Sequence, residues 1–190
     1  MRFVQEEKGD IIIITAALFV ILLFFTGIAL DVGMVYFEHS RLENACQMVK
    51  ENRFTHENTV RFSENPGEQV SSLVEDVLTD NGFTGKADVY FYEETAEDGS
   101  LLPNYRRYRM RVVLSRECPW HFLRIFGEEN ITIRSSIDFE NSFGELSSDM
   151  VWHPGDPPES YTGKYTMDFS DGSFSFEQGK LPEDWERSTL

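Results

Sequence analysis

The feature that most constrains this chain is an uninterrupted apolar run from Ile11 to Leu30, twenty residues without one charged side chain. An α-helix rises about 1.5 Å per residue, so the run spans about 30 Å, the hydrocarbon thickness of a bilayer. A secretory signal has an apolar core of about 7–15 residues followed by a small-residue cleavage site, and residues 31–36 offer no such site. The run therefore predicts a retained membrane helix, with a cleaved signal and a buried soluble helix as the alternatives.

Basic residues favour one orientation of this helix in the cell membrane. Arg2 and Lys8 precede the run, whereas the first basic residue after it is Arg41. Basic residues near the ends of a membrane helix collect on the cytoplasmic side. We therefore expect a single-pass protein with a short cytoplasmic arm, residues 1–10, and with residues 31–190 outside the cytoplasm.

The charge of the chain excludes one class of partner. Its 190 residues carry 17 basic and 33 acidic side chains, which gives a net charge of −16. Phosphate binding needs a basic face, so this balance argues against a nucleic-acid partner. It also argues against adhesion of the part beyond the run to anionic lipid, and it is typical of a well-solvated surface.

A second helical pattern continues directly from the apolar run. No proline occurs between Asp31 and Arg53, and apolar or weakly polar residues recur there at alternating spacings of three and four: Val32, Val35, His39, Leu42, Cys46 and Val49. This spacing places them on one face of a helix. We expect that face to pack on the protein's own sheet, with a partner helix in an assembly as the alternative.

The middle of the chain predicts a small antiparallel sheet with two further helices. Asn65-Pro66 and Asn81-Gly82 enclose an amphipathic segment, and Pro119–Phe126 suits a short helix that ends before Gly127. Three segments alternate in the manner of strands: 87–95, 105–116 and 130–140. In the second of these, we expect Arg106, Arg107, Arg109 and Arg111 to lie on a solvated face beside acidic neighbours.

The acidic tail, residues 141–190, contains a hairpin signal. Aromatic and polar residues alternate on both sides of Asp171-Gly172, which predicts a hairpin over 164–177. An isolated hairpin is marginal in water, so we expect its aromatic face to dock on the main sheet or on a partner. The last ten residues, 181–190, are expected to form an exposed end.

Two stretches resemble the TadE/TadG-like minor pilins of the tight-adherence (Flp) pilus machinery. Lys8-Gly9, the apolar run, "ALDVGMVY" at 29–36 and "RLENA" at 41–45 resemble the N-terminus of that family. "WHFLRIFG" at 120–127, followed by "ITIRSS" at 131–136, is similar to its closing segment. The resemblance covers about residues 8–53 and 117–138.

The resemblance implies a structural role in pilus biogenesis or secretion. The helix and strand patterns agree with this role, because they predict an α+β fold that is pilin-like in outline. In this fold a long N-terminal helix, half transmembrane and half amphipathic, packs on the sheet of an extracytoplasmic domain, 31–140. Gly9 is a candidate site of leader cleavage. Prepilins have glutamate five residues into the mature chain, where this sequence has Ile14, so an uncleaved anchor is favoured.

The sequence offers no constellation for catalysis, a metal or a cofactor, and no small-molecule substrate is evident. Cys46 and Cys118 both follow the run, and outside the cytoplasm they form a candidate disulfide. A buried, inert Cys46 on the helix stripe is the alternative. The four histidines are scattered singly, and none has zinc-site spacing with a cysteine.

Two functions remain after these exclusions. The first is a membrane-anchored pilin-like component whose helix packs against other pilus or secretion-machinery proteins, with Ala29 and Gly33 as its small-residue contact face. The second is a single-pass extracytoplasmic binding or sensory domain. An unbroken helix favours the first, and the aromatic-rich tail keeps the second open.

Overall fold

The computed structural model describes residues 3–55, 59–60, 62–93, 106–143 and 158–185. The chain forms two compact units. The helix unit comprises Met1–His39 and Glu117–Ile133, and the sheet unit comprises Ser40–Arg116 and Arg134–Leu190. The long helix and the two longest strands contribute residues to both units.

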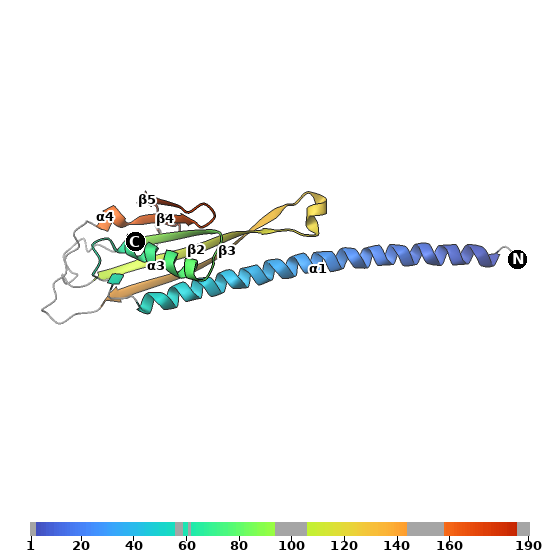
Figure 1. Ribbon diagram of the computed structural model, residues 1–190, viewed down its shortest axis with the longest axis horizontal. Coiled ribbons are helices and arrows are strands. Elements are labelled where there is room, and N and C mark those ends of the chain that lie inside the picture. Colours follow the sequence, from blue (N-terminus) through green and yellow to red (C-terminus); the bar gives the residue numbers. More distant parts are fainter. Residues whose placement is uncertain (1–2, 56–58, 61, 94–105, 144–157, 186–190) are drawn as a thin grey trace. The chain divides into compact units, whose positions relative to one another are not determined.

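Helix α1 runs from Phe3 to Thr55 (Figure 1). No proline interrupts its backbone hydrogen bonds, and the residues expected to form a short arm are helical from Phe3 onward. Within the apolar run, the hydroxyl groups of Thr15 and Thr26 donate to carbonyl oxygens one turn earlier, each at 2.8 Å. These bonds satisfy the threonine hydroxyl groups within the helix itself, which is what a helix in lipid requires.

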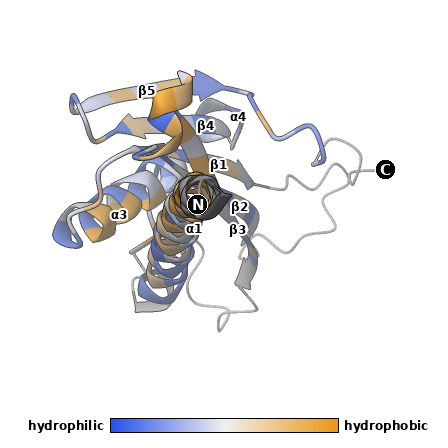
Figure 2. Cartoon of the chain, turned by 90° about the vertical axis from the view of Figure 1, so that its right-hand side faces the viewer, coloured by the Kyte–Doolittle hydropathy of each residue, from blue (hydrophilic) through white to orange (hydrophobic). Residues whose placement is uncertain are grey.

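The apolar run makes α1 long and apolar enough to cross a membrane, and within the described residues it is the one helix that meets this condition. Every residue from Ile11 to Thr26 is exposed. Figure 2 looks along α1 from its N-terminal side, and orange, apolar segments surround the helix axis there. An apolar surface on all sides of a helix is typical of a membrane span.

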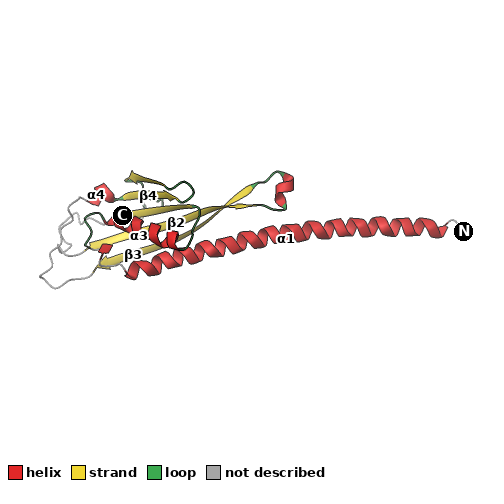
Figure 3. Ribbon diagram, in the orientation of Figure 1, coloured by secondary structure: helices red, strands yellow, loops and turns green. Residues whose placement is uncertain are grey.

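The strands, yellow in Figure 3, form a five-stranded sheet in the order β3-β2-β1-β4-β5. Its strands are β1 Lys86–Glu93, β2 Arg106–Pro119, β3 Asn130–Phe143, β4 Gly163–Asp168 and β5 Ser173–Gln178. Strand β1 pairs antiparallel with β2 on one side and with β4 on the other. The predicted α+β fold, with its long helix and antiparallel sheet, is therefore confirmed.

The C-terminal hairpin is confirmed, and it belongs to the main sheet. Strands β4 and β5 pair antiparallel, with Tyr165 opposite Phe176, and β4 pairs with β1, with Val89 opposite Tyr165. Gly172 adopts a φ of +71° in the turn, a conformation that glycine reaches without steric cost. The hairpin therefore gains the neighbouring strand that an isolated hairpin lacks.

One face of the sheet forms the core of the sheet unit. Its buried side chains alternate along the strands as the sequence predicts: Ala87, Val89, Phe91, Tyr108, Met110, Val112, Leu114, Tyr165 and Met167. Helix α3, Pro66–Asp80, packs against β1 and β4, and the Asn65 side chain caps it by accepting from the Glu68 amide at 2.9 Å. Leu42, Cys46 and Val49 of α1 are buried in the same unit.

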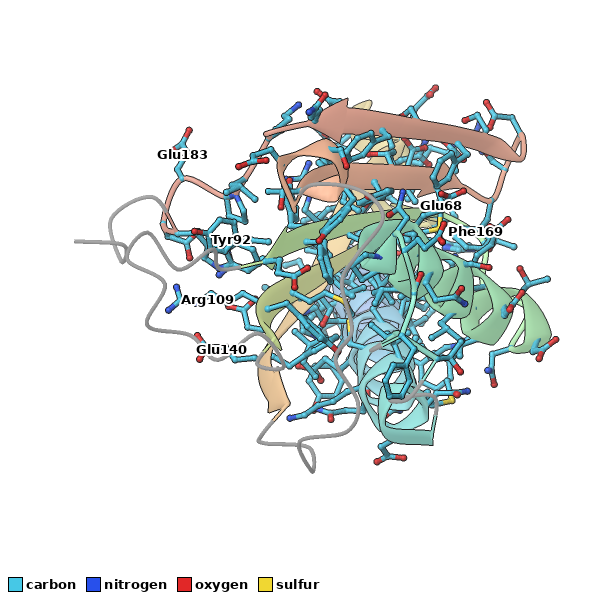
Figure 4. All side chains as sticks on the ribbon, turned by 90° about the vertical axis from the view of Figure 1, so that its left-hand side faces the viewer. Glu68, Tyr92, Arg109, Glu140, Phe169 and Glu183 are labelled. Carbon is cyan, nitrogen blue, oxygen red and sulfur yellow. The ribbon has the colours of Figure 1, made fainter. Side chains whose placement is uncertain are left out.

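The opposite face of the sheet carries ion pairs between neighbouring strands. Arg109 contacts Glu140 at 2.9 Å (Figure 4), and two nitrogens of the Arg111 guanidinium donate to Asp138. Hydrogen bonds to Asp138 and then to Asp184 raise the pKa of Arg111 above its ordinary value. The expected acidic neighbours are confirmed for these two residues, but the face is not solvated there, because the two arginine side chains are only 17 % and 19 % exposed.

The C-terminal segment departs from the expected exposed end. Asp184 accepts two hydrogen bonds from Arg111, each at 2.7 Å, and the Trp185 ring lies 5.5 Å from the same guanidinium. Trp185 is only 9 % exposed. The segment is held because the planar Arg111 guanidinium donates hydrogen bonds to the Asp184 carboxylate and also stacks its face on the Trp185 ring. Residues 186–190 lie outside the described part.

The hairpin's aromatic face is only half covered, so the expectation that it docks on the main sheet holds for β4 and not for β5. Tyr165 and Met167 on β4 are 3 % exposed, whereas Phe174 and Phe176 on β5 are 53 % and 37 % exposed. The cause is position, because β5 is the edge strand of the sheet and α3 packs over β1 and β4. Phe169 follows β4 and packs edge-to-face on Phe83 instead.

Candidate functional site

The most specific polar contact of the helix unit joins α1 to the far end of the β2–β3 hairpin. The Asp31 carboxylate accepts hydrogen bonds from three successive backbone amides: from His121 at 3.0 Å, from Phe122 at 2.9 Å and from Leu123 at 2.8 Å. The hairpin end carries the short 3₁₀ helix η1, Leu123–Phe126, which is visible at the end of the yellow strands in Figure 1. We call residues 120–127 the hairpin tip.

The carboxylate acts as an N-terminal cap supplied from another element. The first amides of a helix have no partner within the helix, and Phe122, at the N-cap position of η1, makes no side-chain capping bond. Asp31 fills this role from 90 residues away in the sequence. The other end of η1 closes at Gly127, whose φ of +95° allows its amide to donate to the Arg124 carbonyl at 3.1 Å.

Asp31 is ionised in this arrangement. The side chain is only 2 % exposed. Burial raises the pKa of the Asp31 carboxyl, but hydrogen bonds from the Leu123, His121 and Phe122 amides outweigh this effect, so the pKa lies below its usual value. A carboxylate that accepts several amide hydrogen bonds is stabilised in its charged form. The contact therefore persists at neutral pH.

Aromatic packing fixes the hairpin tip against the same helix. The Phe122 and Phe126 rings lie 5.8 Å and 6.0 Å from the Phe24 ring, both edge-to-face. A Cβ atom at Gly27 would lie only 2.3 Å from the Phe122 ring. Gly27 therefore provides the space in which Phe122 packs directly on the helix backbone.

The predicted contact face, Ala29 and Gly33, lies on the other side of α1. Residues two apart on a helix lie roughly 200° apart around its axis, so these two residues face away from Gly27 and Asp31. Both are exposed, and a Cβ atom added at Gly33 meets nothing within 4 Å. The hairpin tip thus occupies one side of the helix and leaves the small-residue side open.

The predicted stripe on the outer half of α1 is correct in its later part and wrong at its start. Leu42, Cys46 and Val49 are buried, but Val32 is 56 % exposed. Asp31 takes the buried position instead, because its carboxylate satisfies backbone amides that no apolar side chain can satisfy.

The two cysteines are buried, and within the described part of the chain no disulfide joins them. Cys46 lies 3.8 Å from the Ser135 hydroxyl, and burial raises the pKa of its thiol. A raised pKa keeps the thiol protonated and unreactive. Pairing of Cys46 with Cys118 stays a prediction. Cleavage after Gly9, which lies inside α1, also stays a prediction.

A hollow in the sheet unit offers the place that a ligand-binding function would use. It lies between the outer part of α1 and the C-terminal end of α3, and polar residues of its lining include Arg41, Asn44, Asn81 and Arg116. Among the described residues, no group of three metal-ligating side chains gathers anywhere. The hollow mixes polar and apolar walls and points to no particular reaction.

Sequence reasoning missed Asp31, Gly27 and Phe122 as a set. Asp31 carried a usable signal, since an acidic residue directly at the end of a membrane run is costly unless it has a partner. The partner lies 90 positions later, and no periodicity or spacing rule connects segments so far apart. Gly27 carried no signal of its own within an apolar run.

The fold and the site together define an α+β protein with a long N-terminal helix. The hairpin tip binds one face of this helix, and the rest of the surface of the apolar run is exposed. Residues 9–47 match the model of a family described as "Putative Flp pilus-assembly TadE/G-like". The TadE/TadG-like resemblance is therefore confirmed over that segment, which contains the whole apolar run as well as Gly27, Asp31 and Gly33. Comparisons with curated proteins and with solved structures gave no match.

Proposed function

We propose that this protein is a membrane-anchored, pilin-like structural component of tight-adherence (Flp) pilus assembly or of a related secretion machinery. Residues 11–30 form its single membrane span, the N-terminus is cytoplasmic, and residues 31–190 are extracytoplasmic. The role is structural and not enzymatic. The observation that carries the proposal is the TadE/G-like match over residues 9–47, which coincides with a helix whose residues 11–26 are all exposed.

The working surface of this component is the open side of α1. Lipid and apolar side chains are equally apolar, so association of helices in a membrane depends on close packing, and small residues allow backbones to approach. Ala29 and Gly33 are one turn apart, and both are exposed. The hairpin tip covers the Gly27 and Asp31 side, so the Ala29 and Gly33 side is open to a second membrane helix.

The role is tested by removing the chain from cells that assemble these pili and by counting surface pili. We expect pili to be lost on deletion and restored by the full chain. Ala29→Leu should fail to restore them at a normal membrane level, because leucine keeps the helix apolar but prevents close approach. Ala17→Leu is the matched control, since it makes the same substitution in the same helix at a position that lies roughly 120° around the helix axis from Ala29.

The outcomes separate the parts of the proposal. Normal pili after deletion would refute the assembly role and would favour the binding domain, with the hollow beside α3 as its site. Normal pili with Ala29→Leu alone would refute the contact face and leave the assembly role in place.

A further inference from the structure

We propose that the hairpin tip, residues 120–127, is a second membrane contact, in which Ile125 and Phe126 enter the outer leaflet beside the last two turns of the apolar run. This inference rests on the proposed membrane span. It adds a lipid-binding element that lies about 90 residues after the span in the sequence and that converts a single-point anchor into a two-point one.

The depth of the tip follows from its contacts within the helix unit. The Phe122 and Phe126 rings both pack on Phe24. Phe24 lies six residues before Leu30, which corresponds to about 9 Å along the helix axis. If residues 11–30 cross the bilayer, rings that touch Phe24 lie below the end of the run. Apolar elements that bind a membrane surface bury to about 5–10 Å, so the depth of the tip matches that class of contact.

The side chains at the apex of the tip are suited to lipid. Ile125 is 74 % exposed and Phe126 is 62 % exposed, and they are adjacent in the sequence. In water, two large apolar side chains exposed together are unfavourable. At this level of the helix the surroundings are acyl chains, which also surround the exposed residues of the run itself. Lipid is therefore the occupant that the position of the tip selects.

The backbone of the tip is prepared for a medium without water. Non-helical backbone at membrane depth needs internal hydrogen bonds. The amides of residues 121–123 donate to Asp31, the Ile125 amide donates to the Phe122 carbonyl at 3.2 Å, and the Gly127 amide donates to Arg124 at 3.1 Å. Asp31 thus satisfies the three amides that η1 cannot satisfy itself, at the level where the run ends.

The polar residues of the tip fit the headgroup region. The Trp120 amide donates to the Glu129 carbonyl at 3.0 Å, which places Trp120 and the acidic pair Glu128 and Glu129 together at the neck of the tip. Tryptophan favours the membrane interface, and the exposed Arg124 can extend its stem toward lipid phosphates. The contact is apolar, so it does not depend on the charge-driven adhesion that the acidic composition argues against.

The test places a spin label at position 125 of the full chain in phosphatidylethanolamine/phosphatidylglycerol nanodiscs. Ile125→Cys removes an exposed side chain and so disturbs little packing. The wild-type chain, whose two thiols are buried, measures background labelling. Leu18→Cys in the run and Asp76→Cys on the exposed side of α3 provide the lipid and water references. Collision of each label with oxygen, which concentrates in lipid, is compared with collision with a water-soluble nickel chelate.

We expect the oxygen-to-nickel ratio at position 125 to exceed that at position 76 several-fold and to approach that at position 18. A ratio equal to that at position 76 would place the tip in water and overturn the inference. A label at 125 that is shielded from both reagents would show a second protein surface there, and would also overturn it. A water-like ratio at position 18 would refute the membrane span itself, so failure of the proposed function is distinguishable from failure of the tip contact alone.

Discussion

Replacing Gly27 by alanine tests whether close packing at one helix position holds the hairpin tip. The added Cβ atom would lie 2.3 Å from Cδ2 and 2.4 Å from Cγ of Phe122. Ordinary contact begins at 3.4 Å, so the ring must retreat by about 1.1 Å. The near part of the ring cannot swing aside freely, because Phe122 is held by Phe24 and Phe126 and its own amide binds Asp31.

The expected cost follows from what the retreat disrupts. If the Phe122 backbone moves with the ring, its 2.9 Å hydrogen bond to Asp31 lengthens to about 4 Å, which is outside hydrogen-bond range. If the ring alone moves, the edge-to-face contact with Phe24 is lost. Overpacking of this kind costs about 1–3 kcal/mol, so opening of the tip should become about 5- to 150-fold more frequent. The higher helix propensity of alanine does not change the free energy of docking, because α1 is helical whether or not the tip is docked.

Hydrogen–deuterium exchange of the amides of residues 121–123 measures this opening directly. Gly33→Ala is the matched control, because it makes the same substitution six residues later, where the new Cβ atom meets nothing within 4 Å. We expect faster exchange in the Gly27→Ala chain and unchanged exchange in the Gly33→Ala chain. Equal exchange rates in the two variants and the wild type would refute the reasoning.

Three further changes have expected outcomes. The pKa of Asp31 is lowered in the folded state, so docking of the tip should be complete above the ordinary carboxyl pKa and should be lost as pH falls through the lower folded-state value. Asp31→Asn should weaken docking and remove this pH dependence in the same exchange experiment. If the exchange rates of Asp31→Asn still changed with pH as in the wild type, this prediction would be contradicted. Phe91→Ala removes a fully buried ring that stacks on Tyr108 at 5.2 Å, so it should lower the free energy of unfolding by about 3–5 kcal/mol in a denaturant titration. Phe174 is exposed, so Phe174→Ala should change the free energy of unfolding by about 0.5 kcal/mol or less. Equal effects of the two variants would contradict the assigned core. Gly163→Ala would bring a Cβ atom to 2.3 Å from the Glu177 carbonyl oxygen and should cost about 1–3 kcal/mol with loss of exchange protection in β5, a result that retained protection would refute.

Much of the fold could be predicted because its signals are local. Alternation of apolar and polar residues located the strands, as Val89 and Phe91 show, and Asn65 with Pro66 marked the start of α3. The turn at Asp171-Gly172 located the last hairpin. Each of these patterns depends on neighbours within a few residues, which is the range over which periodicity and capping rules operate.

The rest depended on contacts between distant segments. Asp31 and Gly27 acquire their roles from a tip about 90 residues later, and the buried Trp185 acquires its place from Arg111 on β2. The exposure of Phe174 follows from β5 being the edge strand, and strand order has no local signature. Gly27, Phe174 and Trp185 are ordinary in their own segments, and the acidic Asp31 signals only that a partner exists without indicating which segment provides it.

Protease shielding on intact cells and on spheroplasts, combined with the intact mass of the membrane-extracted protein, tests the central claim most directly. A single anchored chain predicts a retained run of residues 11–30, with digestion of residues 31–190 only from the outer side. A chain that begins after residue 30 and is free in the medium, or one that is digested only from the cytoplasmic side, would contradict the account.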